Sequence, residues 1–271
     1  MVARRSPSES ADASNEETLR KALAKSEAEV EELRARLAEL VSAGEAFLSE
    51  AAHAIGSPLT VTHSYLEILF TDLSEGLTEE QRSFLGIAYE NAVKLRQLVE
   101  DLVELAALET GTAQIDPAPT SVRQIIESLR TELQPVFDRK GLQLTTEVED
   151  DLPPVTADEN RLRDVLRRIV DNAVRFTPEG GSIVLQAKPK HDHLLIEISD
   201  TGAGIPADLL DEVFRAFVQL HRKSGENREG FGLGLSLCRR QVEAMGGTLD
   251  MESTEGEGTT VTIRIPVSRD K

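Results

Sequence analysis

Residues 200–206 read Asp-Thr-Gly-Ala-Gly-Ile-Pro, and they follow an apolar stretch, Leu194–Ile198, that alternates as a β-strand does. Asp200 therefore ends a predicted strand, and Gly202 and Gly204 follow it closely. Glycine permits a tight backbone turn and lets a flat ring approach the main chain. An Asp-Gly turn that binds nothing is the alternative, but such a turn does not require the Gly-Ile-Pro that follows. We interpret this loop as one wall of a ligand pocket.

Two further segments lie on either side of this loop in the sequence. Residues 171–176 read Asp-Asn-Ala-Val-Arg-Phe and end a predicted helix, 159–176, whose apolar residues face the sheet. Residues 230–235 read Gly-Phe-Gly-Leu-Gly-Leu and precede an apolar helix predicted to start near Leu235. Backbone N–H groups at a helix start can hold phosphate oxygens without a cationic side chain. A dinucleotide-binding interpretation fails, because no parallel strand–turn–helix unit surrounds these glycines.

In this order and with these intervals, the three segments resemble the Asn box and the two glycine boxes of the sensor histidine kinase ATP-binding domain. Upstream, residues 52–59 read Ala-His-Ala-Ile-Gly-Ser-Pro-Leu and resemble the phospho-accepting histidine site of that family. The resemblance covers residues 45–268. It implies a protein-histidine kinase of two-component signalling that uses ATP and Mg²⁺.

The resemblance also implies roles for the residues of the pocket. Asn172 ligates Mg²⁺ through its amide oxygen, a ligand type that this hard ion prefers. Asp200 accepts a hydrogen bond from the adenine amino group. The other implied nucleotide contacts are Arg175, Phe176, Gly202, Gly204, Arg228, Gly230, Gly232 and Gly234.

The polar stretch at residues 221–229 resembles the mobile lid that closes over ATP in this family. Arg228 is a candidate phosphate contact within it, and a solvated surface charge is the equal alternative. For Arg175 the alternative is a plain charge on a helix surface. We expect Phe214 and Phe217 to anchor the base of the lid as core residues.

A histidine on a helix is more often structural than catalytic, so His53 needs support from its context. Pro58, five residues later, frees the carbonyl of Ala54 and bends the helix, which we expect to aim the imidazole outward. An unperturbed imidazole has a pKa of about 6.5 and is mostly neutral at pH 7. The resemblance implies that a neutral ring nitrogen of His53 attacks the γ-phosphorus of ATP.

Three positions depart from the family pattern. The residue after the phospho-accepting histidine is usually an acid that orients the ring and takes its proton, and here it is Ala54. General-base help is worth about 10² to 10⁴ in rate. Glu50 lies three residues before His53, on the same helical face, and is a candidate substitute. Arg168 stands where the Asn box usually opens with a second Asn. Ser57 replaces a Thr or Asn and keeps a hydroxyl for dephosphorylation of the partner regulator.

The N-terminal half divides into three predicted segments. Residues 1–17 are polar and are expected to form a disordered tail. Residues 18–46 carry a heptad seam, which favours a coiled coil over a long solvated helix. Residues 47–110 predict two helices, the second starting after Thr78. We expect an antiparallel hairpin that pairs with a second copy as a four-helix bundle, and thus a homodimer.

The C-terminal half mixes helices with mostly antiparallel strands. Residues 111–120 contain Pro117 and Pro119 without periodicity and are expected to be a linker. Residues 121–268 predict a two-layer α/β sandwich, so the chain as a whole is of the α+β class. The resemblance implies the Bergerat type of ATP-binding domain.

Composition excludes several classes of protein. The net charge of −18 argues against a nucleic-acid binder. No stretch approaches the roughly 18 apolar residues of a membrane span, and the first 16 residues lack the apolar core of a signal peptide. We therefore expect a cytoplasmic protein without a membrane span. The single cysteine, Cys238, excludes an internal disulfide and is expected to be core filler.

The leading hypothesis is a dimeric kinase that phosphorylates His53 and passes the phosphoryl group to an Asp of a separate response regulator. No receiver or DNA-binding segment follows Ile265, so the receiver domain is expected to act in trans, and any sensor to be a separate protein. The alternative is a degenerate kinase, an ATP-binding dimeric scaffold with weak or no autophosphorylation, which Ala54 and Arg168 favour. A purely structural coiled-coil protein is poorly compatible with the glycine segments.

Overall fold

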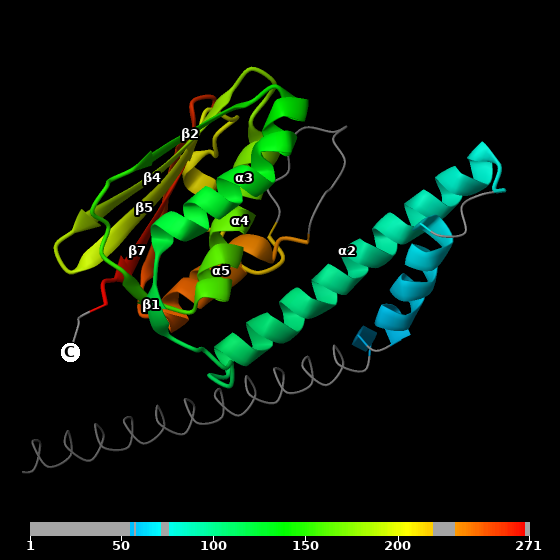
Figure 1. Cartoon of the computed structure of the whole chain (residues 1–271), viewed down its shortest axis with the longest axis horizontal. Helices are drawn as coiled ribbons and strands as arrows, with labels where there is room; N and C mark the ends of the chain where they lie inside the picture. The colour runs from blue at the N-terminus through cyan, green and yellow to red at the C-terminus, as the bar shows by residue number, and fades with distance from the viewer. Residues whose placement is uncertain (1–54, 57, 72–75, 219–230, 269–271) are drawn as a thin grey trace, which may run out of the picture.

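The structure is a computed structural model that describes residues 55–56, 58–71, 76–218 and 231–268. A helical hairpin is followed along the chain by a mixed α/β domain (Figure 1). The predicted tail and coiled coil lie outside the described residues, as do Glu50, His53, Ser57, Arg228 and Gly230. Within the described ranges, no helix is both long enough and apolar enough to cross a membrane.

The hairpin consists of a first helix, described over residues 55–56 and 58–71, and of α2, Glu79–Glu109. Thr78 caps α2 reciprocally with Gln81: the Thr78 hydroxyl accepts from the Gln81 N–H at 3.2 Å, and the Gln81 side chain accepts from the Thr78 N–H at 3.0 Å. Glu79 and Glu80 place negative charge in the first turn, where the helix dipole favours it. The predicted start after Thr78 is confirmed.

The two helices of the hairpin share a small apolar contact. Leu59 and Val99 are buried against each other, with Leu102 and Val103 packed beside them. Many other large apolar side chains of the hairpin remain exposed in the single chain, among them Val61, Tyr65, Ile68, Leu69, Phe84, Ile87 and Leu95. One hairpin therefore covers only part of its own apolar surface.

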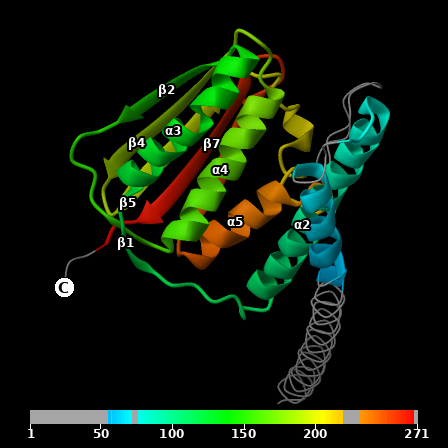
Figure 2. The ribbon, with the colours of Figure 1, turned by 45° about the vertical axis from the view of Figure 1, so that its right-hand side comes forward.

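The α/β domain is built on a five-stranded sheet with the order β2-β4-β5-β7-β6. Its main elements are α3 (Val122–Lys140), β2 (Gln143–Val148), α4 (Glu159–Phe176), β4 (Ser182–Lys190), β5 (His193–Asp200), α5 (Gly234–Ala244), β6 (Thr248–Thr254) and β7 (Gly258–Pro266). The β2–β4 pair is parallel, and the other neighbours are antiparallel. Helices α3, α4 and α5 lie on one side of the sheet (Figure 2). The predicted two-layer α/β sandwich is confirmed.

A second, smaller sheet joins β1 (Ala118–Thr120) to β3 (Val155–Ala157) in antiparallel pairing. Sequence analysis assigns no strand to β1, because its three residues contain a proline and no apolar alternation. The hydroxyl of Thr120 donates to the Ala157 carbonyl at 2.9 Å. The stretch expected to be a linker therefore ends in a strand that is fixed to the α/β domain.

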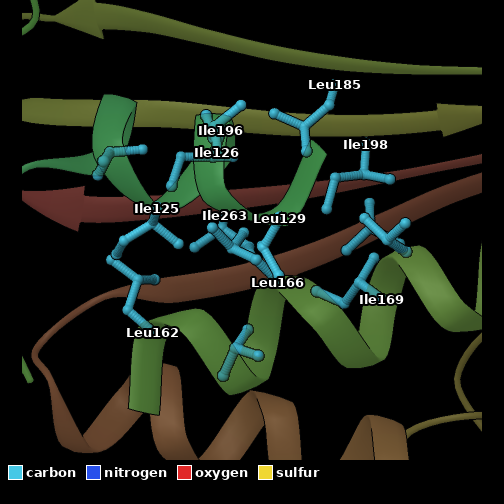
Figure 3. Packing of buried hydrophobic residues seen from close by; sticks show 14 of the residues in the cluster. Ile125, Ile126, Leu129, Leu162, Leu166, Ile169, Leu185, Ile196, Ile198 and Ile263 are labelled. Carbon is cyan, nitrogen blue, oxygen red and sulfur yellow. The ribbon is translucent and has the colours of Figure 1, made fainter. Parts of the chain in front are cut away.

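The core of the domain lies between α3, α4 and the sheet (Figure 3). Helix α4 begins at the predicted residue, because the Asp158 side chain caps it by accepting from the Arg161 N–H at 3.2 Å. Leu162 and Leu166 of α4 are fully buried. Cys238 of α5 is also fully buried, and burial raises the pKa of its thiol to about 12. The prediction that Cys238 fills the core is confirmed.

Truncation of Leu166 tests the central position of α4. The Leu166→Ala variant leaves a cavity beneath the sheet, so its free energy of unfolding should fall by about 2–5 kcal/mol, measured by urea denaturation. The volume-conserving Leu166→Met variant should lose less than about 1.5 kcal/mol. Equal losses in the two variants would contradict this account of the core.

Candidate functional site

The loop at residues 200–206, which we call the Asp-Gly loop, is tied to the end of α4. The Ala203 N–H donates to the Phe176 carbonyl at 3.3 Å, and the Thr201 N–H donates to the Ser182 carbonyl at 3.1 Å. These bonds place the last residue of the Asn segment against the Asp-Gly loop. The structure therefore brings together two of the three segments that sequence analysis singled out.

The other side of the Asp-Gly loop is tied to the turn between β6 and β7. The Ile205 N–H donates to the Ser253 hydroxyl at 2.8 Å, and the Gly256 N–H donates to the Ala203 carbonyl at 2.9 Å. The Ser253 hydroxyl in turn donates to the Gly258 carbonyl at 2.8 Å. The loop is thus held from both sides by main-chain hydrogen bonds and by the hydroxyls of Thr201 and Ser253.

Asp200 lies half-buried at the end of β5, where one carboxylate oxygen accepts from the Gly202 N–H at 2.8 Å. Burial raises the pKa of this carboxyl, and the backbone N–H groups of Gly202 and Thr259 oppose the shift only in part. Burial therefore outweighs the two backbone donors in its effect on the pKa of Asp200. A ligand N–H that donates to Asp200 would therefore be favourable here.

The glycines of the Asp-Gly loop serve the contact between protein segments. A Cβ atom on Gly202 would lie 2.7 Å from the Phe176 carbonyl oxygen, and one on Gly204, where φ is 62°, would lie 1.9 Å from the Thr254 carbonyl oxygen. Both glycines were expected to permit a tight backbone turn and to let a flat ring approach the main chain, and the φ of 62° at Gly204 confirms the turn. The structure gives a nearer cause, since the backbone of the protein itself occupies the space.

The second glycine segment is described from Phe231 onward. The Phe217 N–H donates to the Gly232 carbonyl at 3.0 Å, and α5 begins two residues later at Gly234. A Cβ atom on Gly232, where φ is 75°, would lie 2.6 Å from the Val218 carbonyl oxygen, whereas one on Gly234 would meet no atom of the described residues within 4 Å. Space is therefore left beside Gly234 at the start of α5, whereas neighbouring backbone atoms fill the space beside Gly232.

The expectation that Phe217 is a core residue is wrong. Its side chain is 61% exposed, and its φ angle of 64° is rare for a bulky residue. The physical reason lies in the backbone, which turns at Phe217 to reach Gly232. Phe214 behaves as expected and packs partly buried against the core, with the Arg239 guanidinium 3.5 Å from its ring centroid.

Helix α4 presents the Asn segment at its C-terminal end. Asn172 is half-buried, Phe176 is 46% exposed, and the guanidinium of Arg175 lies 4.9 Å from the centroid of the Phe176 ring. No group of three or more His, Cys, Asp or Glu side chains that could hold a metal occurs among the described residues. A Mg²⁺ ion at Asn172 would therefore take most of its oxygen ligands from phosphates and water, which this ion accepts.

Comparison with known families matches both parts of the chain. Residues 44–111 match the model of the His Kinase A (phospho-acceptor) domain family. Residues 157–269 match the family described as histidine kinase-, DNA gyrase B- and HSP90-like ATPase. The chain belongs to the sensor histidine kinase family.

Similar kinases include much longer chains. The circadian input-output histidine kinase CikA of Thermosynechococcus vestitus is 32% identical over 90% of this chain and 35% of its own length. The adaptive-response sensory kinase SasA of Synechococcus sp. (strain JA-2-3B'a(2-13)) is 32% identical over 87% of this chain and 63% of its own length. The crystal structure of full-length ShkA in complex with AMPPNP superposes with a TM-score of 0.69 at 28% identity, over 82% of this chain and 46% of that one. This chain thus spans about a third to two thirds of these relatives.

Sequence analysis of this histidine kinase missed three residues that shape the site. Ser253, Gly258 and Thr259 all contact the Asp200 strand or the Asp-Gly loop. Gly258 has a φ of 122°, and a Cβ atom there would lie 1.9 Å from the Asp200 carbonyl oxygen. The available signal was the second glycine of the Glu-Gly-Glu-Gly run at residues 255–258, which by itself indicates only a turn between strands.

Alanine at Gly258 tests whether this close approach holds Asp200 in place. Gly180→Ala is the matched control, because Gly180 has a φ of 82° and a Cβ atom there would meet nothing within 4 Å. The control should lose about 1 kcal/mol of unfolding free energy from backbone strain alone. The Gly258→Ala variant should lose a further 1–3 kcal/mol or so, by urea denaturation, because it also overpacks the strand. Similar losses of unfolding free energy in the Gly258→Ala and Gly180→Ala variants would show that the close approach at Gly258 does not stabilise the domain.

Proposed function

We propose that this chain is an ATP-dependent protein-histidine kinase that phosphorylates His53 and passes the phosphoryl group to an Asp of a separate response regulator. The observation that carries the proposal is the junction of Asp200 and its loop with the end of α4, downstream of a phospho-acceptor domain. That junction places a desolvated carboxylate beside the helix that bears Asn172. Because ATP is the phosphoryl donor, we propose the cytoplasm as the compartment.

The nucleotide would lie between the three segments. Asp200 would accept from the adenine amino group, and the exposed ring of Phe176 would offer an apolar face. Asn172 would ligate Mg²⁺, with Arg175 and Arg228 near the phosphates. The backbone at the open start of α5 suits phosphate oxygens. The glycines assigned to this cradle are Gly202, Gly204, Gly230, Gly232 and Gly234.

The reaction would proceed in two transfers. A neutral ring nitrogen of His53 attacks the γ-phosphorus, an N–P bond forms, and the bond between that phosphorus and the β,γ-bridging oxygen breaks to release ADP. Ala54 cannot take the ring proton, so Glu50 is the candidate base. The phosphoryl group then leaves the ring nitrogen for a receiver-domain carboxylate. In a separate step, the Ser57 hydroxyl would position a water molecule that attacks the phosphorus on the receiver carboxylate and releases inorganic phosphate.

The exposed apolar side of the hairpin supports a homodimer. Phe84 is 63% exposed, Tyr65 67% and Ile87 56%, which is unusual for a soluble surface when such residues gather on one hairpin. A second hairpin would cover these side chains in a four-helix bundle. The response regulator, and any sensor protein, would bind this dimer in trans.

A degenerate kinase is the second candidate, and one contact favours it. Arg168, in place of the usual Asn, is engaged by Asp101 of α2 and not by the Asn segment. Such a protein would bind ATP and dock partners with little or no autophosphorylation.

Substitution of Asp200 tests the adenine contact. Asp200→Asn should weaken ATP binding in the presence of Mg²⁺ by about 10- to 100-fold in calorimetry, since a hydrogen bond to a charged group is lost. The thermal unfolding midpoint should hold, because the Asn oxygen still accepts from Gly202 and no desolvated charge remains. The exposed Asp151→Asn variant serves as the control and should bind as the parent does. Unchanged affinity in Asp200→Asn would remove Asp200 from the site.

Labelling with γ-labelled ATP and Mg²⁺ tests the kinase against the scaffold. The parent chain should acquire an acid-labile label that His53→Ala abolishes. His63→Ala is the matched control, because the His63 ring packs at a tilt against Tyr89 with ring centroids 5.2 Å apart, and it should keep the label. Glu50→Gln should slow labelling by about 10²- to 10⁴-fold if Glu50 is the base, and unchanged labelling would remove it. ATP binding without label in the parent would establish the scaffold.

A further inference from the structure

Helix α2 contacts its two neighbours with opposite faces. Val99 packs against Leu59 of the first helix, and a Cβ on Gly56 would lie 3.6 Å from Val99. Asp101 and Glu104 contact the α/β domain instead. Each residue advances about 100° around a helix, so Asp101 lies about 200° from Val99. Figure 1 shows the same arrangement, with the first helix and the α/β domain on opposite sides of α2.

A bidentate ion pair across this boundary joins Asp101 to Arg168 of α4. The two terminal nitrogens of Arg168 donate to the two carboxylate oxygens of Asp101, at 2.7 Å and 3.1 Å. Asp101 is only 8% exposed. Burial acts to lower the pKa of Arg168, but the hydrogen bond and charge of Asp101 outweigh it and raise this pKa. A paired geometry of this kind is strong and directional.

Two further carboxylates of α2, those of Glu104 and Glu109, also contact the α/β domain. Glu104 accepts from Arg161 of α4 and from the Gln241 side chain of α5, the latter at 2.7 Å. Glu109 pairs with Arg240 of α5 at 2.6 Å. In all four contacts the carboxylate belongs to α2 and the donor belongs to the α/β domain, and three of the four donors are arginines. The interface is therefore held by complementary charge, and Figure 2 shows α5 lying against α2.

Arg168 also shares a helix face with the candidate nucleotide site. It precedes Asn172 by four residues, and residues four apart lie on the same side of a helix. The contact with Asp101 therefore fixes that face of α4 toward α2. In this arrangement the body of α2, about 10 Å across, separates the Asn172 face from the first helix of the same chain.

We propose that Asp101 and Arg168 form a latch that parks the α/β domain on the side of α2 away from the first helix, and that phosphoryl transfer within one chain requires this latch to open. The parking rests on the contacts above. The consequence for transfer rests on the proposed kinase function.

Hydrogen exchange on the full chain without nucleotide tests the parking independently of activity. Asp101→Asn and Arg168→Gln should each speed amide exchange in α5 by about tenfold, which corresponds to about 1.4 kcal/mol. Arg163→Gln is the matched control on the same helix, because its ion pair with Glu132 lies within the α/β domain. It should leave exchange in α5 unchanged. The swapped pair Asp101→Arg with Arg168→Asp should restore slow exchange.

Autophosphorylation of the same variants tests the consequence. Both single substitutions should raise the initial labelling rate at least about threefold, and the swapped pair should return it toward the parent value. Unchanged exchange in both single variants would overturn the latch. Faster exchange with slower labelling would also overturn it, since the docked state would then be the productive one. Faster exchange with no label in any protein, the parent included, would support the parking and refute the kinase function instead.

Discussion

On both sides of the Asp-Gly loop, the backbone of the loop lies directly against the backbone of a neighbouring segment. The geometry of the candidate site depends on these close contacts. A Cβ atom on Gly204 would lie 1.9 Å from a carbonyl oxygen of β6, and one on Gly258 would lie equally close to the carbonyl of Asp200. With glycine at both positions, the end of β5, the β6–β7 turn and the end of α4 converge. Asp200 is desolvated as a result, and its carboxylate is held by backbone donors in a fixed direction.

The same helix that meets the Asp-Gly loop also carries the contact to the hairpin. Arg168 and Asn172 lie one turn apart on α4, so the orientation of the candidate site relative to the hairpin depends on what Arg168 binds. A carboxamide at position 168 could not make the paired, charge-assisted bonds that a guanidinium makes with Asp101. The arginine that stands at this position in place of the family's Asn therefore has a structural partner, Asp101 of α2.

Local signals predicted the regular elements well. The apolar spacing of residues 159–176 predicted α4 with the bounds that the structure shows, and the predicted start of α2 after Thr78 is also confirmed. Strand β1 was missed, because Ala118–Thr120 becomes a strand only by pairing with residues that lie far away in the sequence. The apolar character of Phe217 predicts a core residue, whereas a backbone turn sets its actual position. The contact of Asp101 with Arg168 could not be predicted either, because only the tertiary structure shows which acidic residue of α2 is buried.

The bond from the Phe217 N–H to the Gly232 carbonyl joins the chain on either side of residues 218–231. For a loop whose ends are held together, each doubling of length costs only about 0.6 kcal/mol in closure entropy. Insertions and deletions within this segment are consequently cheap for the folded domain. The sheet and its helices can therefore stay the same while the number of residues between Phe217 and Gly232 changes.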